Sequence, residues 1–554
     1  MAITKKWWIA IGIVVVVVVG GSLAGYELTK STTKDIVLYT WWATEGKIAL
    51  QKEIPSFEKA YPGYSVSLEI TPGGGGDNSV ATVLSLIEAG KPPDAFQAHM
   101  GPMMYSYVSA DSKGINGFVN WTSYYKTNLS GHVIPAAFEA GSMNGVLLSM
   151  PVEVHTMGLL YMNQAVLHRY NLPIPTNVWM LQNDTNALVH DGFDNSTAAP
   201  WGISANEGGW AQLQLWENNF LGLAGTKLYN EFTYGTLNTS NPAVSHIINQ
   251  TNSLFLNESK YDYPGWQTMS WTQMASELIN GNVAFLTAGD FVTNYMYDYY
   301  NTTSYPATAQ YINNTSAPVL VQSFPGTQSY FVVNLDSIGV PSGPTAAYGT
   351  TFVKYWTSPA GNKVWTKWKG LSYYNNITTD YYNTPEQWYM YQKLVHTTNP
   401  SDFVYALSDG GLFASPDTTL TGNLLTLQES NGTASKLSNW NSAISSQIGV
   451  EKSTWLSANN LSLGYLGFPG SPFGGYLPPW ANSTYNMTGS GSHAVSDLQL
   501  YQHSNHQSTH AASGNLVSNL PQVKVTQVGT TSLPIANIDF KAMVVNNFKS
   551  LKPN

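Results

Sequence analysis

The pattern of apolar and polar positions predicts alternating strands and helices from residue 35 onward. Residues 35–42 (DIVLYTWW) and 94–101 (DAFQAHMG) are short apolar runs of strand length, and residues 64–70 (YSVSLEI) alternate between apolar and polar. Between them, apolar residues recur at the spacing of a helix face. These positions are Leu50, Ile54, Phe57 and Tyr61, then Val80, Val83, Leu84 and Ile87. The β-α-β-α-β order predicts an α/β fold with a parallel sheet covered by helices.

A different pattern marks the N-terminus. Lys5 and Lys6 precede an apolar stretch, Trp7 to Leu28, which is uncharged through Tyr26. It is long enough to cross a bilayer, which takes about 20 residues. Basic residues before the stretch predict a cytoplasmic N-terminus with the rest of the chain outside the cell. We interpret residues 1–30 as a leader or membrane anchor. Cleavage by signal peptidase near residues 22–24, cleavage by a prepilin-type peptidase and an uncut anchor all remain open.

The composition excludes several classes of protein. The chain has 554 residues, no cysteine, 10% charged residues and a formal net charge of −9. Without cysteine it has neither disulfides nor a cysteine zinc site. With so few Lys and Arg it lacks the basic surface that binds nucleic acid. Because few basic groups limit the repulsion that arises once carboxylates are protonated, the composition also suggests an acid medium.

Asn-x-Ser/Thr sequons are dense, which suggests a glycosylated surface in an archaeon or eukaryote. Each sequon is weak evidence by itself, because a chain rich in Asn, Ser and Thr produces some by chance. The candidates are Asn120, Asn128, Asn183, Asn195, Asn238, Asn249, Asn257, Asn301, Asn313, Asn314, Asn376, Asn431, Asn460, Asn482 and Asn486.

Polar and aromatic residues gather at the carboxyl ends of the predicted strands, where α/β sheets bind their ligands. Trp41, Trp42 and Glu45 follow the first strand, and Gln97 and His99 end the third. Indole rings pack against the apolar C–H faces of sugars, while amides and carboxylates satisfy hydroxyl groups. The two tryptophans could instead be core residues, but adjacent strand residues point to opposite faces. We therefore expect at least one of them to line a pocket for a neutral polyhydroxyl ligand.

Several long stretches, in collinear order, resemble one family. The stretches are LYTWWATEGKIALQKEIPSFEKAYPGYSV, GGGGDNSVATVLSLIEAGKPPDAFQAHMG, MPVEVHTMGLLYMNQAVLHRYNLPIPTNVW, GGWAQLQLWENNFLG, INGNVAFLTAGDFVTNYM and FPGTQSYFVVNLDSIGVPSG. From residue 35 to about residue 450, the chain resembles the extracellular solute-binding proteins of ATP-binding-cassette (ABC) sugar importers. Within them it resembles the maltose-binding-protein-like group and most closely its glucose-binding members, with a thermoacidophilic archaeon as the expected source.

The resemblance implies a type II periplasmic-binding-protein-like fold, with two α/β lobes joined by hinge crossovers and sugar bound between them. Residues 35–150 and 283–332 would form the N-terminal lobe, and residues 151–282 and 333–450 the C-terminal lobe. The crossovers are expected near residues 150–155, 283–290 and 332–339. Lobe closure would present one surface to a membrane permease, and the protein would capture a hexose or small oligosaccharide without a cofactor or catalysis.

The resemblance also implies sugar contacts at ten positions. These are Trp41, Trp42, Glu45, Gln97, His99, His155, Trp210, Asp290, Lys369 and Asp409. Asp409 departs from the family, because glucose-binding relatives have a histidine there, and this leaves open the choice among glucose, galactose and mannose. Each position also has a structural alternative: Trp210 and Trp216 could be helix core, Asp290 could cap a helix, and His155 could be an interior histidine.

The C-terminal extension, residues 451–554, has no counterpart in the resemblance. It contains an aromatic region rich in Gly and Pro, then His493, His503, His506 and His510. These histidines lack accompanying carboxylates beyond Asp497, so we do not interpret them as a metal site. Two other functions stay open at this stage. One is a secreted carbohydrate-active enzyme, for which Glu45, Glu153 and Asp290 offer carboxylates. The other is a glycosylated cell-surface structural protein.

Overall fold

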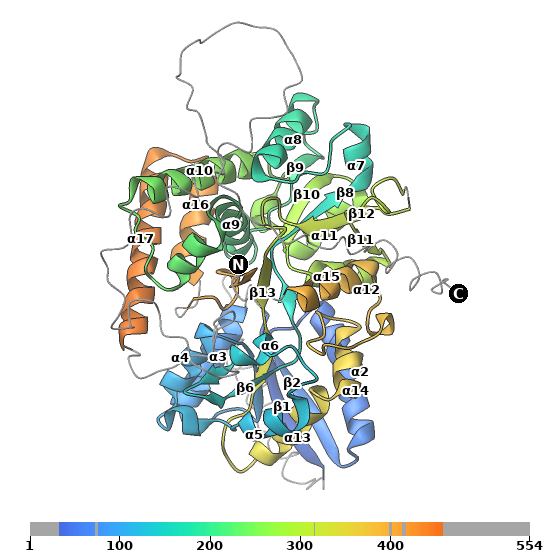
Figure 1. Ribbon diagram of the computed structural model, residues 1–554, viewed down its shortest axis with the longest axis vertical. Helices are drawn as coiled ribbons and strands as arrows, with labels where there is room; N and C mark the ends of the chain where they lie inside the picture. The colour runs from blue at the N-terminus through green and yellow to red at the C-terminus, as the bar shows by residue number, and fades with distance from the viewer. Residues whose placement is uncertain (1–32, 73–75, 315, 398–401, 413–416, 458–554) are drawn as a thin grey trace, which may run out of the picture.

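The computed structural model describes residues 33–72, 76–314, 316–397, 402–412 and 417–457. The predicted leader or anchor at residues 1–30 and nearly all of the C-terminal extension lie outside these ranges. Within them, no helix combines the length and the apolar character needed to cross a membrane. The described residues form two α/β lobes, the first in the lower half of Figure 1 and the second in the upper half.

The first lobe begins with the predicted β-α-β-α-β unit. It comprises β1 (Lys34–Thr40), α2 (Glu45–Ala60), β2 (Tyr64–Ile70), α3 (Asp77–Glu88) and β3 (Ala95–His99). Strand β1 pairs in parallel with β2 on one side and with β3 on the other. The prediction of a parallel sheet in this part of the chain is confirmed. The carboxyl ends of β1 and β3 therefore lie side by side.

Two later strands complete this sheet. β14 (Asp336–Gly339) pairs antiparallel with β3, and β6 (Ser149–Pro151) pairs antiparallel with β14, giving the order β2-β1-β3-β14-β6. Helices α13 (Ala346–Trp356) and α14 (Pro359–Thr366) pack against α2. The remaining elements between β3 and β6 are α4 (Pro102–Ala110), η2 (Gly114–Gly117), α5 (Thr122–Tyr124), η3 (Tyr125–Leu129), α6 (Ala136–Glu139), β4 (Ser142–Met143) and β5 (Val146–Leu147).

The second lobe is built on a sheet of order β11-β12-β8-β10-β9. Its strands are β8 (Leu159–Asn163), β9 (Ala199–Trp201), β10 (Val283–Ala288), β11 (Ser304–Pro306) and β12 (Val319–Ser323). The helices that follow these strands or lie between them are α7 (Gln164–Arg169), α8 (Val178–His190), α9 (Trp210–Thr233), α10 (Pro242–Ser259), η4 (Trp266–Thr268), α11 (Trp271–Asn280) and α12 (Phe291–Tyr300). Of the later helices, η5 (Thr379–Tyr381) contacts α14 of the first lobe. The second lobe contains α15 (Pro385–His396), η7 (Asp417–Thr421), α16 (Gly422–Glu429) and α17 (Ala434–Ser457).

A small third sheet joins the lobes. It has the order β15-β13-β7, with β7 (His155–Thr156), β13 (Phe331–Asn334) and β15 (Phe403–Tyr405). The chain passes from β6 of the first lobe into β7, and from β13 back into β14 of the first lobe. Strand β13 accordingly lies between the two halves of the molecule in Figure 1. These two passages are at the positions where crossovers were expected, near residues 150–155 and 332–339.

The predicted lobe boundaries need correction elsewhere. Residues 283–332 were expected in the first lobe, but β10, β11 and β12 all belong to the second sheet, so no crossover lies near 283–290. Residues 336–366, expected in the second lobe, contribute β14, α13 and α14 to the first. The chain returns to the second lobe between α14 and α15, which packs against β11. Every residue of β10 is buried, and such a strand carries no sequence signal for which sheet it joins.

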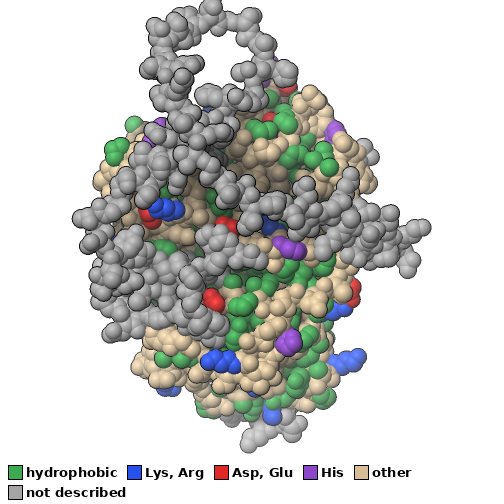
Figure 2. Space-filling model, in the orientation of Figure 1, with side chains coloured by type: hydrophobic (Ala, Val, Ile, Leu, Met, Phe, Trp, Pro, Cys, Tyr) green, Lys and Arg blue, Asp and Glu red, His purple; other side chains and the backbone are tan. Residues whose placement is uncertain are grey.

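The surface reflects the low charge of the sequence. On the face shown in Figure 2, Lys, Arg, Asp and Glu side chains are few and scattered among uncharged ones. The interior, by contrast, contains many carboxyl groups, although the sequence has few charged residues. Among those buried in the described chain are Glu53, Glu153, Glu217 and Glu258. Buried charges need partners or must be neutralised.

Candidate functional site

A cavity of about 450 Å³ opens between the lobes beside the small third sheet. Eight of the ten predicted site residues line it. They are Trp41, Trp42, Glu45, His99, His155, Trp210, Lys369 and Asp409. They come from both lobes: the first three follow β1, while Trp210 begins α9. Strand ends and helix starts on opposite sides of the cleft thus bring together residues that are far apart in the sequence.

The first-lobe wall of the cavity carries two tryptophans in different settings. Trp41 is half-buried, and its ring lies edge-on to the His99 ring, with centroids 5.0 Å apart. Trp42 is buried and packs against Trp365, with ring centroids 4.7 Å apart. Its Nε1 nonetheless donates to Oδ2 of Asp336 at 3.1 Å. Trp42 is therefore both core and cavity wall, so the two alternatives weighed from the sequence are compatible for this residue.

The second-lobe wall is aromatic and is backed by a buried carboxylate. The Trp210 ring lies 5.8 Å from that of Phe291, and the Trp271 ring lies 5.1 Å from the same phenyl group. Trp210 Nε1 donates to Oδ2 of Asp409 at 3.2 Å, and the Ser408 hydroxyl donates to the same oxygen. Burial raises the pKa of Asp409. Trp210 thus belongs to the cavity, whereas Trp216 is wholly buried in the core.

Lys369 supplies the positive charge at the deep end of the cavity. Its Nζ lies 3.4 Å from Glu45, 3.5 Å from Glu153 and 3.9 Å from Asp336. Burial would lower the pKa of this amine, but the carboxylates around it raise the pKa above the usual range. Lys369 therefore stays protonated, and it neutralises part of a strongly acidic cluster. Each of its pairs is almost fully buried, so little solvent screens them.

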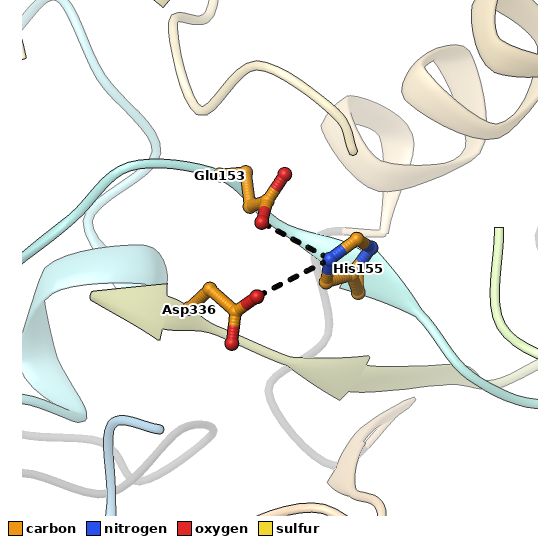
Figure 3. Close-up of side chains that lie close together, drawn as sticks. All are labelled: Glu153, His155 and Asp336. Atoms are coloured by element: carbon orange, nitrogen blue, oxygen red, sulfur yellow. Dashed lines mark ion pairs between the residues drawn. The ribbon is translucent and has the colours of Figure 1, made fainter. Parts of the chain in front are cut away.

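His155, in β7 of the third sheet, belongs to the same cluster. Its Nδ1 lies 2.5 Å from Oδ1 of Asp290, and its Nε2 lies 3.1 Å from Oε1 of Glu153 and 3.6 Å from Oδ2 of Asp336. Figure 3 shows Glu153 and Asp336 pointing toward the same edge of the imidazole ring. Burial would lower the pKa of His155, but Glu153 and Asp290 raise it well above its usual value. Burial would likewise raise the pKa of Asp336, but hydrogen bonds from His155 and His99 hold it well below its usual value.

Glu153, His155 and Asp336 have the donor types and the spacing of a metal site. The ammonium group of Lys369 lies where such an ion would be. It is 2.9 Å from His155 Nε2 and within ion-pair distance of both carboxylates. The cluster therefore already contains its cation, and a metal ion would have to displace a buried lysine.

Two predicted residues, Gln97 and Asp290, lie behind the cavity wall. Gln97 Oε1 accepts hydrogen bonds from the Thr40 hydroxyl at 2.5 Å and from the Trp41 backbone N–H at 3.1 Å, so it fixes the turn that carries the tryptophans. Asp290 pairs with His155 and makes no side-chain cap to α12. The helix-capping alternative for Asp290 is wrong. Both residues position others that line the cavity.

Sequence reasoning missed several residues of the wall. Glu207 Oε1 accepts the Trp271 backbone N–H at 3.2 Å, and burial raises the pKa of its carboxyl group. The other missed polar and aromatic residues are Thr44, Asn78, Asn206, Ser270, Trp271, Thr272, Phe291, Asn334 and Asp336. Asp336 had a usable signal, because it is an acid inside the apolar run FVVNLDSIGV. Glu207 lies in a loop before α9, and Trp271 is the first residue of the amphipathic helix α11, so only the fold brings them to the site.

Comparison with known proteins gives consistent results. Residues 43–363 match the model of a family described as bacterial extracellular solute-binding protein. The chain is 45% identical over 470 residues to the glucose-binding protein GlcS of Saccharolobus solfataricus, covering 84% of this chain and 83% of that one. It is 22% identical over 314 residues to the xylose/arabinose-binding protein XacG of Haloferax volcanii, covering 55% of this chain and 61% of that one.

Solved structures share the fold. The bacterial solute receptor AcbH, described as having an exclusive preference for β-D-galactopyranose, superposes with a TM-score of 0.60 at 12% identity, covering 76% of this chain and 99% of that one. The resemblance inferred from the sequence is confirmed, and so is the two-lobed α/β architecture. The chain belongs to the family of bacterial extracellular solute-binding proteins.

Proposed function

We propose that this protein captures a glucose-type hexose in the interlobe cavity and delivers it to an ABC transporter permease. One observation carries the proposal. The cavity between the lobes is lined by indole rings and by charged side chains that are linked to one another by ion pairs and hydrogen bonds. A neutral polyhydroxyl ligand needs both features, since its C–H faces are apolar and its hydroxyl groups donate and accept. The glucose-binding relative at 45% identity supports the same ligand class.

In this proposal the residues divide into three roles. Trp41, Trp42 and Trp210 provide flat surfaces for the sugar ring. Glu45 and Asp409 accept hydrogen bonds from hydroxyl groups, and His99 and Lys369 donate to sugar oxygens. His155 lines the cavity beside them, with both ring nitrogens paired with carboxylates. Gln97 and Asp290 act indirectly, because they hold the Trp41 turn and the His155 ring in place. None of these roles requires a covalent step, so the protein binds its ligand reversibly and leaves it unchanged.

Delivery requires a location outside the cell. The family is extracellular by description, and residues 1–30 have the sequence features of a leader or an anchor. We propose that the lobes lie on the extracellular face of the membrane, exported or held there by the N-terminal segment. Closure of the lobes around the ligand would then create the surface that the permease recognises.

The experiment is a calorimetric binding screen of the purified protein against glucose, galactose, mannose and small oligosaccharides, from pH 4 to pH 7. We expect one-to-one binding of at least one hexose. In parallel, the protein is incubated with disaccharides, and the products are followed by chromatography. Absence of binding to every sugar, or hydrolysis with turnover, would defeat the proposal.

A further inference from the structure

Four of the sequons have one backbone geometry in common. In each, the asparagine side-chain oxygen accepts the backbone N–H of the Ser or Thr two residues later, which is an Asx turn. The Oδ1 atoms that accept are those of Asn120 from Thr122 at 3.0 Å, Asn195 from Thr197 at 3.0 Å, Asn238 from Ser240 at 3.1 Å and Asn314 from Ser316 at 3.0 Å. In two of them, the hydroxyl of Thr197 or Ser316 also donates to the asparagine oxygen, at 3.0 and 2.7 Å.

Four other sequons lie in helical segments. They differ from the first four in the environment of the sequon hydroxyl group or of the asparagine nitrogen. Asn183 lies in α8, and both Asn249 and Asn257 lie in α10. Their hydroxyl partners are Thr185, Thr251 and Ser259, each at most 3% exposed. Asn128 lies in η3, and its amide nitrogen donates to the Tyr124 carbonyl oxygen at 3.0 Å. A helix commits the backbone N–H to the preceding turn, so it cannot form the Asx turn.

The Asx turn prepares the asparagine for reaction at nitrogen. A donor bound to Oδ1 withdraws electron density from the amide and favours loss of a proton from Nδ2, and at Asn195 and Asn314 the sequon hydroxyl group also donates to this oxygen. We propose that Asn120, Asn195, Asn238 and Asn314 are N-glycosylation sites, and that the helical asparagines are not. In the reaction, Nδ2 forms a bond to the anomeric carbon of a polyprenyl-phosphate-linked glycan. The bond from that carbon to the phosphate oxygen breaks, and the Nδ2 proton leaves to a base of the transferase.

The four sites also differ at the asparagine nitrogen. The Asn195 nitrogen donates to the Gly192 carbonyl oxygen at 3.1 Å in an exposed turn, so water must replace this bond before reaction. The nitrogens of Asn120, Asn238 and Asn314 have no such acceptor among the described residues. We therefore expect Asn195 to carry the lowest occupancy of the four.

The four turns lie apart from the cavity. They are in the segments before α5, between α8 and β9, between α9 and α10, and between β11 and β12, and none of the four asparagines lines the cavity. Glycans at these positions would therefore leave the cleft accessible. Modification and ligand binding can succeed or fail independently of each other.

The test is glycopeptide mass spectrometry of the protein isolated from its own cells. We expect a glycan mass on the peptides of Asn120, Asn195, Asn238 and Asn314, and unmodified Asn128, Asn183, Asn249 and Asn257. Unmodified turn asparagines, or equal occupancy in turns and helices, would overturn the proposal.

Variants produced in the same cells sharpen the result. Thr197→Ala and Ser316→Ala remove only exposed hydroxyl groups and should each delete one glycan, whereas Thr197→Ser and Ser316→Thr should keep it. Retention of the glycan in both alanine variants would refute the role of the hydroxyl group. Before the glycans are analysed, thermal unfolding of each variant is compared with that of the parent. Matching curves show that the variant folds.

Discussion

Buried carboxyl groups should make this protein most stable in acid. Burial raises the pKa of Glu217 and of Glu258 to about 8 in the folded protein, against an ordinary value of 4.5. Between these two values the folded state holds a proton that the unfolded state has released. Unfolding therefore releases protons in this range, and the free energy of unfolding must fall as the pH rises.

The size of the effect follows from the same values. Each such group lowers the free energy of unfolding by about 1.4 kcal/mol per pH unit, or roughly 3 kcal/mol between pH 4.5 and pH 7. His155 acts in the same direction, because its raised pKa gives stability below its ordinary value of 6.5 that is lost at higher pH. Asp336 acts oppositely, since its lowered pKa gives stability that is lost only below about its ordinary value of 3.8. The maximum should therefore lie near pH 4 to 5.

Glu258→Gln isolates one of these groups. The amide keeps the oxygen that accepts the Asn219 Nδ2 hydrogen bond, 2.6 Å long in the parent, but cannot ionise. In urea unfolding followed by tryptophan fluorescence, we expect the variant to match the parent at pH 4.5 and to exceed it at pH 7, by roughly 3 kcal/mol. Glu88→Gln, at an exposed position at the end of α3, should change neither value. The reasoning would be refuted if the parent became more stable from pH 4.5 to pH 7. It would also be refuted if the free energy of unfolding of Glu258→Gln changed with pH as much as that of the parent.

Three further substitutions test the site. Lys369→Met leaves Glu45, Glu153 and Asp336 without their shared cation, so it should cost about 3 to 5 kcal/mol of stability at pH 7, measured by urea unfolding; an unchanged midpoint would contradict the charge cluster. Trp210→Phe keeps an aromatic ring but removes the N–H that holds Asp409, so hexose affinity should fall several-fold, corresponding to about 1 kcal/mol in calorimetry. Asp290→Asn removes a charge that raises the pKa of His155, so the NMR titration of His155 should move to lower pH; an unmoved titration would exclude the pairing.

The first five elements could be predicted because their signals are local. The apolar spacing in residues 45–88 fixes helix faces, and a β-α-β connection requires parallel strands. The lobe of β10 could not be predicted in this way, because a fully buried strand looks the same in either sheet. Strand partners depend on contacts across the sheet. The partners of β10 are β8 and β9, which are so far from it along the sequence that no local pattern identifies them.

The candidate site likewise contains some residues that a local sequence pattern predicts and others that it does not. Trp41, Trp42 and His99 could be predicted from the rule that ligands lie at the carboxyl ends of parallel strands. Trp210, Lys369 and Asp409 came from family resemblance alone, since they lie on a helix start and in loops. Their joint presence at one cavity is a finding of the structure. Their individual contacts with a sugar remain predictions.

One residue connects the third sheet directly to the first lobe. Strand β13 of the third sheet and β14 of the first lobe are separated only by Leu335, a buried residue whose carbonyl oxygen accepts the Met100 backbone N–H at 2.9 Å. Its neighbours Asn334 and Asp336 both line the cavity. Points near a rotation axis move little, while distant points sweep long arcs. In the proposed lobe closure, a ligand that touches Asn334 and Asp336 would therefore stay nearly in place, while aromatic side chains farther from this link would move toward it.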